Sequence, residues 1–281
     1  MVKFLIVFRS CFLSITRSSL FSFKRFFMKS VFQITYRWFL PLACLLLGFF
    51  SITAQAEELS IMSFNIRNGR GLNAPDVDLE RPAEVIRQYS PDIAGLQELD
   101  RFSKRCGNRD IPADLGKAVG MKSFFAQAIS FQGGAYGVAS LAKCEPIRTY
   151  HVPLPGKEER RTLQVLEFPT FVFFNTHWSL TKESRLASVE IIEAERKKFT
   201  KPIFLCGDFN AFPDSEEIQK LMSTWTVISP DAPTFPANGP KIRIDYVMTT
   251  LKKDAIKVES AEVLNAPAAS DHAPILVRVR F

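Results

Sequence analysis

The sequence predicts an α/β (α+β) domain in which two packed, mainly antiparallel β-sheets are flanked by helices. Predicted strands outnumber predicted helices, they follow one another as hairpins, and they fall into two halves that each carry helices. Hairpins produce antiparallel sheets, whereas a doubly wound parallel sheet requires strand and helix to alternate along the chain. Two sheets packed face to face, with helices outside, therefore suit the pattern better.

The first half of the domain is predicted from hydrophobic periodicity. In order, we expect a strand at 58–66, a helix at 78–89, a strand at 93–98, a helix at 111–119, and strands at 123–129 and 136–143. Asp78 is a suitable N-terminal cap for the first helix. Two strand ends are unusual, because Asn65 is disfavoured in a strand and Glu98 closes a short apolar run.

The second half continues in the same way. In order, we expect strands at 161–168 and 170–176, a helix at 182–199, a strand at 203–205, a helix at 214–222, and strands at 242–248 and 275–281. The apolar strand that begins at Ile203 stops at Gly207-Asp208-Phe209-Asn210. It therefore carries the Asp208 carboxylate and the Asn210 carboxamide to its C-terminal edge, where α/β proteins usually place their functional sites.

The first 56 residues differ in composition from the rest of the 281-residue chain. They contain no Asp or Glu and seven of the 36 Lys and Arg residues, which leaves 29 basic against 29 acidic residues beyond them. The formal charge of +7 therefore belongs to this leader, and residues 57–281 are neutral overall. Nucleic acid is a conceivable partner, but a neutral domain lacks the electrostatic excess that would support it.

The leader has the features of a signal peptide. Lys29 and Arg37 precede an apolar run at 38–52, and Ala54-Gln55-Ala56 is a small-x-small cleavage site. Met28 is the expected functional start. A retained anchor is the alternative, but the apolar run is shorter than the ~20 residues of a comfortable span. We expect a periplasmic or secreted monomer without a membrane span, consisting of a single domain at 57–281.

Three cysteines lie beyond the leader: Cys106, Cys144 and Cys206. An odd count without CxxC spacing argues against a structural zinc site. Export permits a disulfide. Cys106 with Cys144 is the pair to consider, because Cys206 lies in a predicted buried strand.

Six predicted strand ends carry polar or ionisable residues: Asn65, Glu98, His177, Asp208 with Asn210, Asp245, and Asp271 with His272. One such residue is usually a turn or helix cap, but six at matching positions indicate a shared site. Carboxylate and carboxamide oxygens suit a hard cation such as Mg²⁺ or Mn²⁺, which neutralises phosphate charge during ester cleavage. The two histidines supply proton transfer and a second cation for phosphoryl oxygens.

The ordered motifs SFNIR (63–67), LQE (96–98), NTHW (175–178), GDFN (207–210), RIDYV (243–247) and SDHAP (270–274) resemble the endonuclease/exonuclease/phosphatase superfamily. The resemblance covers residues 58–281, and the segment 78–101 is similar to the plain bacterial exported branch. It implies a DNase I-like four-layer sandwich. It also implies a Mg²⁺- or Mn²⁺-dependent hydrolase that cleaves a phosphodiester by metal-assisted attack of water.

The resemblance also implies a role for each residue. Glu98 would ligate the metal, with Asn65 and Asp271 close by. Asp208 and Asn210 would position or activate the attacking water.

The histidines are assigned in the same way. His272 would act as general base or as a cation that contacts the phosphate, oriented by Asp245. His177 would hydrogen-bond a phosphoryl oxygen or assist the leaving group. The resemblance leaves open whether Asp208 or His272 takes the proton, and whether one or two metal ions are bound.

Three further residues are predicted to bind substrate. Arg67 closes the first motif, and Tyr136 is expected to face the cleft, although Tyr136-Gly137-Val138 departs from the Tyr-Gly-Asn of this branch. Arg160 matches a family position that reaches the cleft, but the adjacent Arg161 leaves the register open. His151 matches no motif and is predicted to be structural.

Several substrates fit this resemblance. The alternatives to a phosphodiesterase are a phosphomonoesterase and a phospholipase C or sphingomyelinase-type hydrolase. A nuclease requires a basic groove, for which the candidates are Arg101, Lys104, Arg105 and Arg109. A lipid hydrolase requires an exposed apolar hairpin, and core packing explains its candidates, Phe124, Phe125 and Phe131, better. A non-catalytic binding protein, the remote alternative, would have lost site residues that this chain retains.

Overall fold

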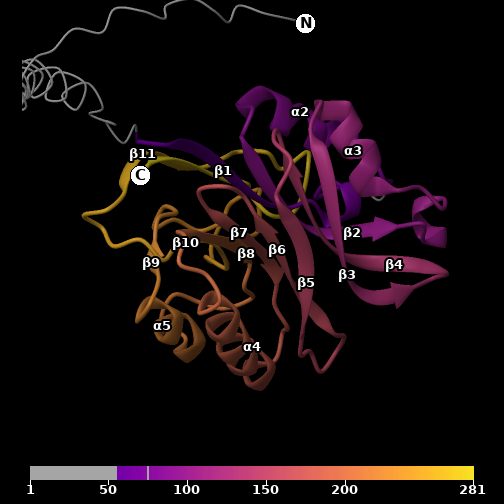
Figure 1. Cartoon of the computed structure of the whole chain (residues 1–281). Helices are drawn as coiled ribbons and strands as arrows, with labels where there is room; N and C mark the ends of the chain where they lie inside the picture. Colours follow the sequence, from indigo (N-terminus) through magenta and orange to yellow (C-terminus); the bar gives the residue numbers. More distant parts are fainter. Residues whose placement is uncertain (1–55, 75) are drawn as a thin grey trace, which may run out of the picture. The chain divides into compact units, whose positions relative to one another are not determined.

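Two six-stranded sheets stack face to face in the computed structural model, which describes residues 56–74 and 76–281 (Figure 1). Sheet A has the order β11-β12-β1-β2-β4-β3, with β1 at Glu58–Asn65, β2 at Ile93–Arg101, β3 at Lys122–Phe131, β4 at Gly134–Ala142, β11 at Lys257–Val263 and β12 at Ile275–Arg280. Sheet B has the order β5-β6-β7-β8-β10-β9, with β5 at Arg148–Leu154, β6 at Arg161–Glu167, β7 at Val172–His177, β8 at Ile203–Asp208, β9 at Thr226–Val227 and β10 at Asp245–Thr249. The predicted leader, apart from Ala56, lies outside the described residues.

Helices cover the outer face of each sheet (Figure 1). The helices α2 (Glu80–Tyr89) and α3 (Ile111–Val119) pack on sheet A, and α4 (Lys182–Arg196) and α5 (Glu216–Met222) pack on sheet B. Short 3-10 turns lie at Arg67–Gly69 (η1) and Lys104–Cys106 (η2). Among the described strands, β1–β2 and β7–β8 pair in parallel and the other neighbours pair antiparallel. The predicted fold class, a four-layer sandwich with mainly antiparallel sheets, is confirmed.

The alternation of side chains along the strands determines where the functional residues point. In β1, Ile61 faces the core between the sheets, whereas Phe64 packs under the helices. Because side chains alternate between faces, Asn65 returns to the inner face at the end of the strand. In β8 the inner row likewise contains Cys206 and ends at Asp208. Polar residues from both sheets therefore follow directly on an apolar core.

A buried polar layer connects the sheets just below these strand ends. Gln97 Nε2 of β2 donates to Asn175 Oδ1 of β7 at 2.7 Å, and Asn175 Nδ2 donates to the Ala139 carbonyl of β4 at 2.9 Å. Ser140 Oγ of β4 donates to Gln164 Oε1 of β6, also at 2.7 Å. Each bond joins sheet A to sheet B, and directional bonds of this kind allow little sliding of one sheet on the other.

The secondary-structure predictions fail mainly at the sheet edges. The strands β5, β9 and β11 were not predicted, and β5 and β11 are edge strands with many exposed positions. An edge strand buries fewer side chains, so its apolar alternation is weak. The strand predicted from residue 242 begins at Asp245. Asp78 accepts a hydrogen bond from the Glu80 backbone amide in the first turn of α2, which is the capping interaction predicted for it.

Two further observations concern the cysteines and the helices. Cys106 is buried, Cys144 is exposed, and both are free thiols, so the pairing considered from the sequence is wrong. Among residues 56–74 and 76–281, none of the helices is long and apolar enough to cross a membrane.

The tight contact between the two sheets at Gly95 gives a testable prediction. A Cβ at this position of β2 would lie 2.3 Å from the Cys206 sulfur of β8. Gly95→Ala should therefore lower the free energy of unfolding by about 1–3 kcal/mol, the usual cost of overpacking, as measured by urea denaturation. Cys206→Ala removes the clashing sulfur. The double variant should be more stable than the sum of the single effects predicts, and simple additivity would contradict the assigned contact.

Candidate active site

Polar side chains from both sheets converge at one end of the space between them. Asn65, His177, Asp208, Asp245 and His272 are each no more than 8% exposed. The strand register brings three of them together, because His177 of β7 and Asp245 of β10 both lie opposite Asp208 of β8. Buried polar groups must find partners, so the contacts among these side chains decide what the site can do.

Asn65 connects a carboxylate of each sheet. Its Nδ2 donates to Glu98 Oε1 and to Asp208 Oδ2, both at 3.0 Å, while its Oδ1 accepts from the Arg67 backbone amide at 3.0 Å. The amide donor of Arg67 fixes the orientation of the carboxamide. Asn65 therefore presents its nitrogen, not its oxygen, to the two carboxylates.

Glu98 reaches this position through a β-bulge. The sequence predicted that the strand would end at Glu98, but β2 continues to Arg101, with a shift of register against β4 between Leu96 and Leu99. Glu98 has a φ of 61°, which is uncommon for a residue other than glycine. Bulges re-aim side chains next to active sites, and this one turns the carboxylate toward Asn65.

The donor chemistry around Glu98 fits a hard divalent cation. Glu98 is half-buried, and among the described residues no Lys, Arg or His forms an ion pair with it. A carboxylate whose remaining oxygen is open to a ligand suits Mg²⁺ or Mn²⁺. Asp271, the other predicted carboxylate ligand, is paired with Arg67, with 3.2 Å between Oδ2 and Nε. To ligate a metal, Asp271 would have to break this ion pair or bind the metal and Arg67 at the same time.

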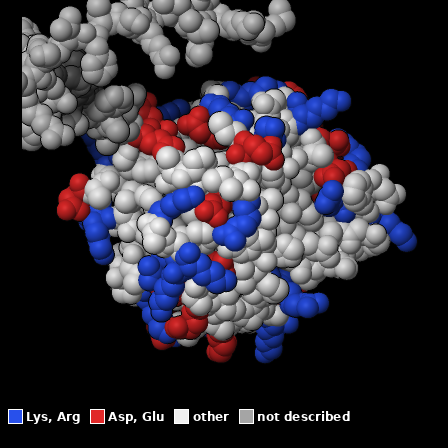
Figure 2. All heavy atoms as spheres, viewed as in Figure 1, with Lys and Arg blue, Asp and Glu red and all other residues white. Residues whose placement is uncertain are grey.

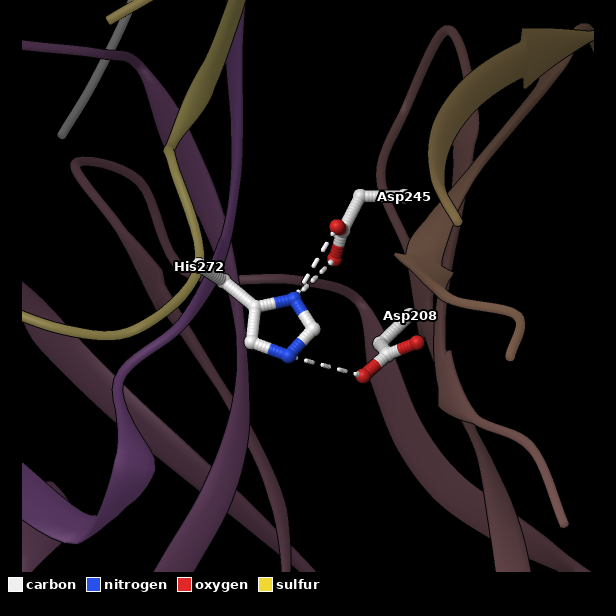
Figure 3. A group of neighbouring side chains, drawn as sticks. All are labelled: Asp208, Asp245 and His272. Atoms are coloured by element: carbon white, nitrogen blue, oxygen red, sulfur yellow. Dashed lines mark hydrogen bonds and ion pairs between the residues drawn. The ribbon is translucent and has the colours of Figure 1, made fainter. Parts of the chain in front are cut away.

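His272 lies between two carboxylates (Figure 3). Its Nδ1 is 3.0 Å from Asp245 Oδ2, and its Nε2 is 3.6 Å from Asp208 Oδ2. Thr234 Oγ1 donates to Asp245 Oδ2 at 2.5 Å and so orients that carboxylate. Burial alone lowers the pKa of His272, but Asp245 and Asp208 outweigh it and raise the pKa to about 10. His272 is thus an imidazolium at neutral pH. Ligand atoms of this trio all lie within 4.8 Å of one another, a spacing that could hold a cation only if His272 lost its proton, because an imidazolium has no free ring nitrogen.

Asp208 is the central carboxylate of the site. Its Oδ2 is the atom that approaches Asn65 and both histidines, and its Oδ1 accepts from the Asn210 amide at 3.0 Å. Burial raises the pKa of Asp208 to about 7, against the opposing charge of His272. A carboxylate with a pKa near neutrality is suited to accept a proton. The Asn210 side chain donates to the Trp178 carbonyl at 3.0 Å, so it fixes the loop after β8.

His177 is in the opposite electrostatic state to His272. Its Nε2 is 3.5 Å from Asp208 Oδ2, and its Nδ1 is 3.1 Å from Arg161 Nη1. Burial lowers the pKa of His177 well below its usual value, and the charges of Arg161 and His272 lower it further. The sequence predicted two histidines that share proton transfer and cationic roles. In the structure only His272 has the environment of a cation.

The predicted substrate-binding residues differ in their placement. Tyr136 lines a small cavity together with Arg161 and His177, as expected for a residue that faces the cleft, and burial raises its pKa. Arg160 is exposed, whereas Arg161 is buried against His177. Of these two adjacent arginines, Arg161 is the one that contacts a predicted site residue. His151 is exposed on β5, outside the group.

Sequence analysis missed two residues that support the site. Arg161 could have been identified, because it begins a strand that leads to the cleft and stands next to the predicted Arg160. Thr234 gave no signal, since it lies in the irregular segment before β10 and meets Asp245 only through the fold.

Comparison with known proteins is consistent with this geometry. Residues 62–272 match the model of the endonuclease/exonuclease/phosphatase family. Exodeoxyribonuclease III of Haemophilus influenzae is 26% identical over 177 residues, which are 57% of this chain and 60% of that protein. The chain thus spans less than two thirds of the length of this relative.

Solved structures show the same fold. A protein from Beutenbergia cavernae described as an endonuclease/exonuclease/phosphatase superposes with a TM-score of 0.67 at 23% identity, over 80% of this chain and 72% of the other. A mannosyl-6-phosphatase from Bacteroides thetaiotaomicron superposes with a TM-score of 0.64 at 19% identity, over 79% and 100% of the two chains.

The raised pKa of His272 predicts how stability depends on pH in the metal-free protein. Its folded-state pKa of about 10 exceeds the ordinary value of 6.5, so its stabilisation is complete below pH 6.5 and is lost as pH rises through 10. Between these two pKa values the free energy of unfolding should fall by about 1.4 kcal/mol per pH unit. His272→Gln should flatten this slope in urea denaturation with chelator present. His151→Gln should keep the slope, and equal slopes in wild type and His272→Gln would contradict the assignment.

Proposed function

Since the chain belongs to the endonuclease/exonuclease/phosphatase family, whose members hydrolyse phosphate esters, we propose that it cleaves a phosphodiester by attack of water with help from a divalent metal. The observation that carries the proposal is the position of Asp208. Its Oδ2 faces Asn65, His177 and His272 at once, so an amide donor and two imidazole rings surround this one carboxylate oxygen.

The residues would divide the chemistry as follows. Asp208, with a pKa near 7, takes a proton from the attacking water, and Asn65 holds its carboxylate in place. His272, kept cationic by Asp245, stabilises the charge that develops on the phosphoryl oxygens. This assignment makes Asp208 the general base and His272 the cation, the alternative that the sequence left open.

A divalent ion would bind at Glu98, whose half-buried carboxylate accepts a hydrogen bond from Asn65 at one oxygen. Asp271, which precedes His272 in the chain, is the second carboxylate proposed as a ligand. When bound, Mg²⁺ or Mn²⁺ neutralises phosphate charge and stabilises the leaving oxygen. The charge balance favours a cation here, because Glu98, Asp208 and Asp245 are all carboxylates and His272 supplies one positive charge among them.

The surface charge limits the substrate. Three of the four basic residues proposed for a nucleic-acid patch are paired with acids: Arg101 with Asp110, Arg105 with Asp100, and Arg109 with Asp114. Acidic and basic side chains are also interspersed on the face in Figure 2. Neutralised pairs contribute little to phosphate-backbone binding. A phosphomonoester or another small phosphate ester is therefore the second candidate substrate.

The phenylalanines considered for lipid binding pack against other parts of the protein. Phe124 and Phe125 are partly buried and pack against the core clusters, and Phe131 lies under the Arg105 guanidinium at 4.4 Å. A substrate panel of DNA, RNA, sphingomyelin, inositol phosphates, nucleotides and sugar phosphates would rank the candidates. Preferred turnover of sphingomyelin would contradict the conclusion that these phenylalanines serve the core and not lipid binding.

Two substitutions test the assigned roles. Asp208→Asn removes the base and His272→Ala removes the cation, so each should lower kcat on an activated phosphodiester by about 10³-fold. Circular dichroism should show that both variants remain folded. His151→Ala is the matched control, because this histidine is exposed outside the site, and it should leave turnover unchanged. Near wild-type turnover in both site variants would reject the mechanism.

Metal dependence gives a separate test. Activity should disappear with excess chelator and return with Mg²⁺ or Mn²⁺. Glu98→Gln should raise the metal concentration needed for half-maximal activity by about 10- to 100-fold, because a charged ligand is lost. Glu259→Gln on β11, far from the strand ends of the site, should leave that concentration unchanged. Full activity in excess chelator would rule out the metal.

We also propose that the protein is exported and acts as a monomer. The support for export is the leader, with Lys29, an apolar run and the cleavage site at Ala56. N-terminal sequencing of the protein recovered from the periplasm or medium should begin at Glu57, and size-exclusion chromatography should give the mass of one chain. Recovery in the cytoplasm with the leader attached would contradict export.

A further inference from the structure

The guanidinium of Arg161 lies directly behind His177. Arg161 is 6% exposed, and its Nη1 is 3.1 Å from the Nδ1 of the imidazole. A guanidinium carries only donors and keeps its proton, so it cannot accept a hydrogen bond from a ring N–H. His177 Nδ1 must therefore be the acceptor. The ring is then neutral, and its one proton resides on Nε2.

We propose that Arg161 is a positioning residue that fixes His177 as a neutral imidazole, with its Nε2–H directed at Asp208 Oδ2 and at the site that a phosphoryl oxygen would occupy. Nε2 already lies 3.5 Å from that carboxylate oxygen. The two histidines are thus held by opposite partners, because the Nδ1 of His272 faces the acceptor Asp245. The assignment of a phosphoryl site rests on the proposed function, whereas the protonation state of His177 does not.

Arg161 is itself fixed on two sides. Glu158 Oε1 is 3.0 Å from Nη2, and Glu159 Oε1 is 3.1 Å from Nη1. Glu158 also accepts from Ser179 Oγ at 2.7 Å and from the Leu180 amide at 2.9 Å. These bonds connect the arginine to the loop that follows His177 in the chain. The guanidinium is therefore held in a fixed position relative to the imidazole of His177.

The chemical consequence concerns what His177 can do. A neutral ring that donates from Nε2 offers one hydrogen bond to a phosphoryl oxygen and adds no second positive charge beside His272. Protonation of Nδ1 would direct an N–H at the guanidinium, so His177 is poorly suited to carry a proton to a leaving group. Of the two roles that the sequence allowed, hydrogen bonding to a phosphoryl oxygen is the one that this geometry supports.

Nitrogen-15 NMR of the histidine rings tests the inference directly. The chain contains three histidines, and His177 is assigned by the signals lost in His177→Gln. In wild type at neutral pH, Nδ1 of His177 should be unprotonated and Nε2 protonated. Arg161→Lys, which keeps a donor, should preserve this pattern, and Arg161→Gln, whose amide can also accept, should allow a share of Nδ1–H. A protonated Nδ1 in the wild-type protein would overturn the inference.

Kinetics provide the second measurement. Arg161→Gln should lower kcat and kcat/KM together by about 10- to 100-fold, the factor that loss of one hydrogen bond from a charged donor corresponds to. Arg161→Lys should recover part of the loss. A rise in KM with unchanged kcat would show that Arg161 binds substrate directly, and would overturn the positioning role.

A control variant separates positioning from general loosening. Arg185 is a half-buried arginine, with a side chain 13% exposed and paired with Glu217. Arg185→Gln should lower the free energy of unfolding and leave the His177 ring as in wild type, and a tautomer change equal to that of Arg161→Gln would contradict the inference. An inactive wild-type protein with an unprotonated Nδ1 would reject the proposed function and leave the role of Arg161 standing.

Discussion

The hydrogen bonds of Asn65 form only when the two sheets are packed at the spacing seen in this structure. One amide nitrogen reaches Glu98 of sheet A and Asp208 of sheet B, each at 3.0 Å, so these carboxylates keep their spacing only if the sheets do. The absence of a side chain at Gly95 lets the sheets approach, and the polar layer around Asn175 prevents them from sliding. Since close-packed protein interiors transmit small displacements, a shift in the packing of the sheets would change the distances between the side chains of the site.

The site concentrates acidic groups where water is scarce. Buried like charges cannot all ionise without compensation, and the structure provides it unequally. Asp245 accepts a hydrogen bond from Thr234 and lies against the imidazolium of His272. Asp208 lies near the other nitrogen of the same ring, and its pKa is raised to about 7. A bound cation at Glu98 would favour the ionised form of Asp208, so metal binding should be coupled to proton release.

Backbone strain supports the same arrangement. Glu98 and Asn210 both have positive φ, at 61° and 48°, although neither is glycine. Such conformations cost of order 1–3 kcal/mol each and persist only where the surrounding structure holds them. The bulge in β2 holds Glu98, and the carbonyl of Trp178 holds Asn210. Rigid strands thus position side chains that an unconstrained loop would leave mobile.

The sequence by itself determined the fold class, the central strands and the set of polar residues at their ends, because buried strands appear as apolar runs or as apolar alternation, and Asn65, Asp208 and Asp245 interrupt these patterns. It did not reveal edge strands such as β5, whose exposed side chains carry little signal. Only the tertiary structure decided the pairing of side chains: Arg161 rather than Arg160 behind His177, Arg67 against Asp271, and Thr234 on Asp245. The reason is physical. Periodicity records which face of a strand is buried, whereas the partner that a side chain meets depends on the register between strands and on how the two sheets stack.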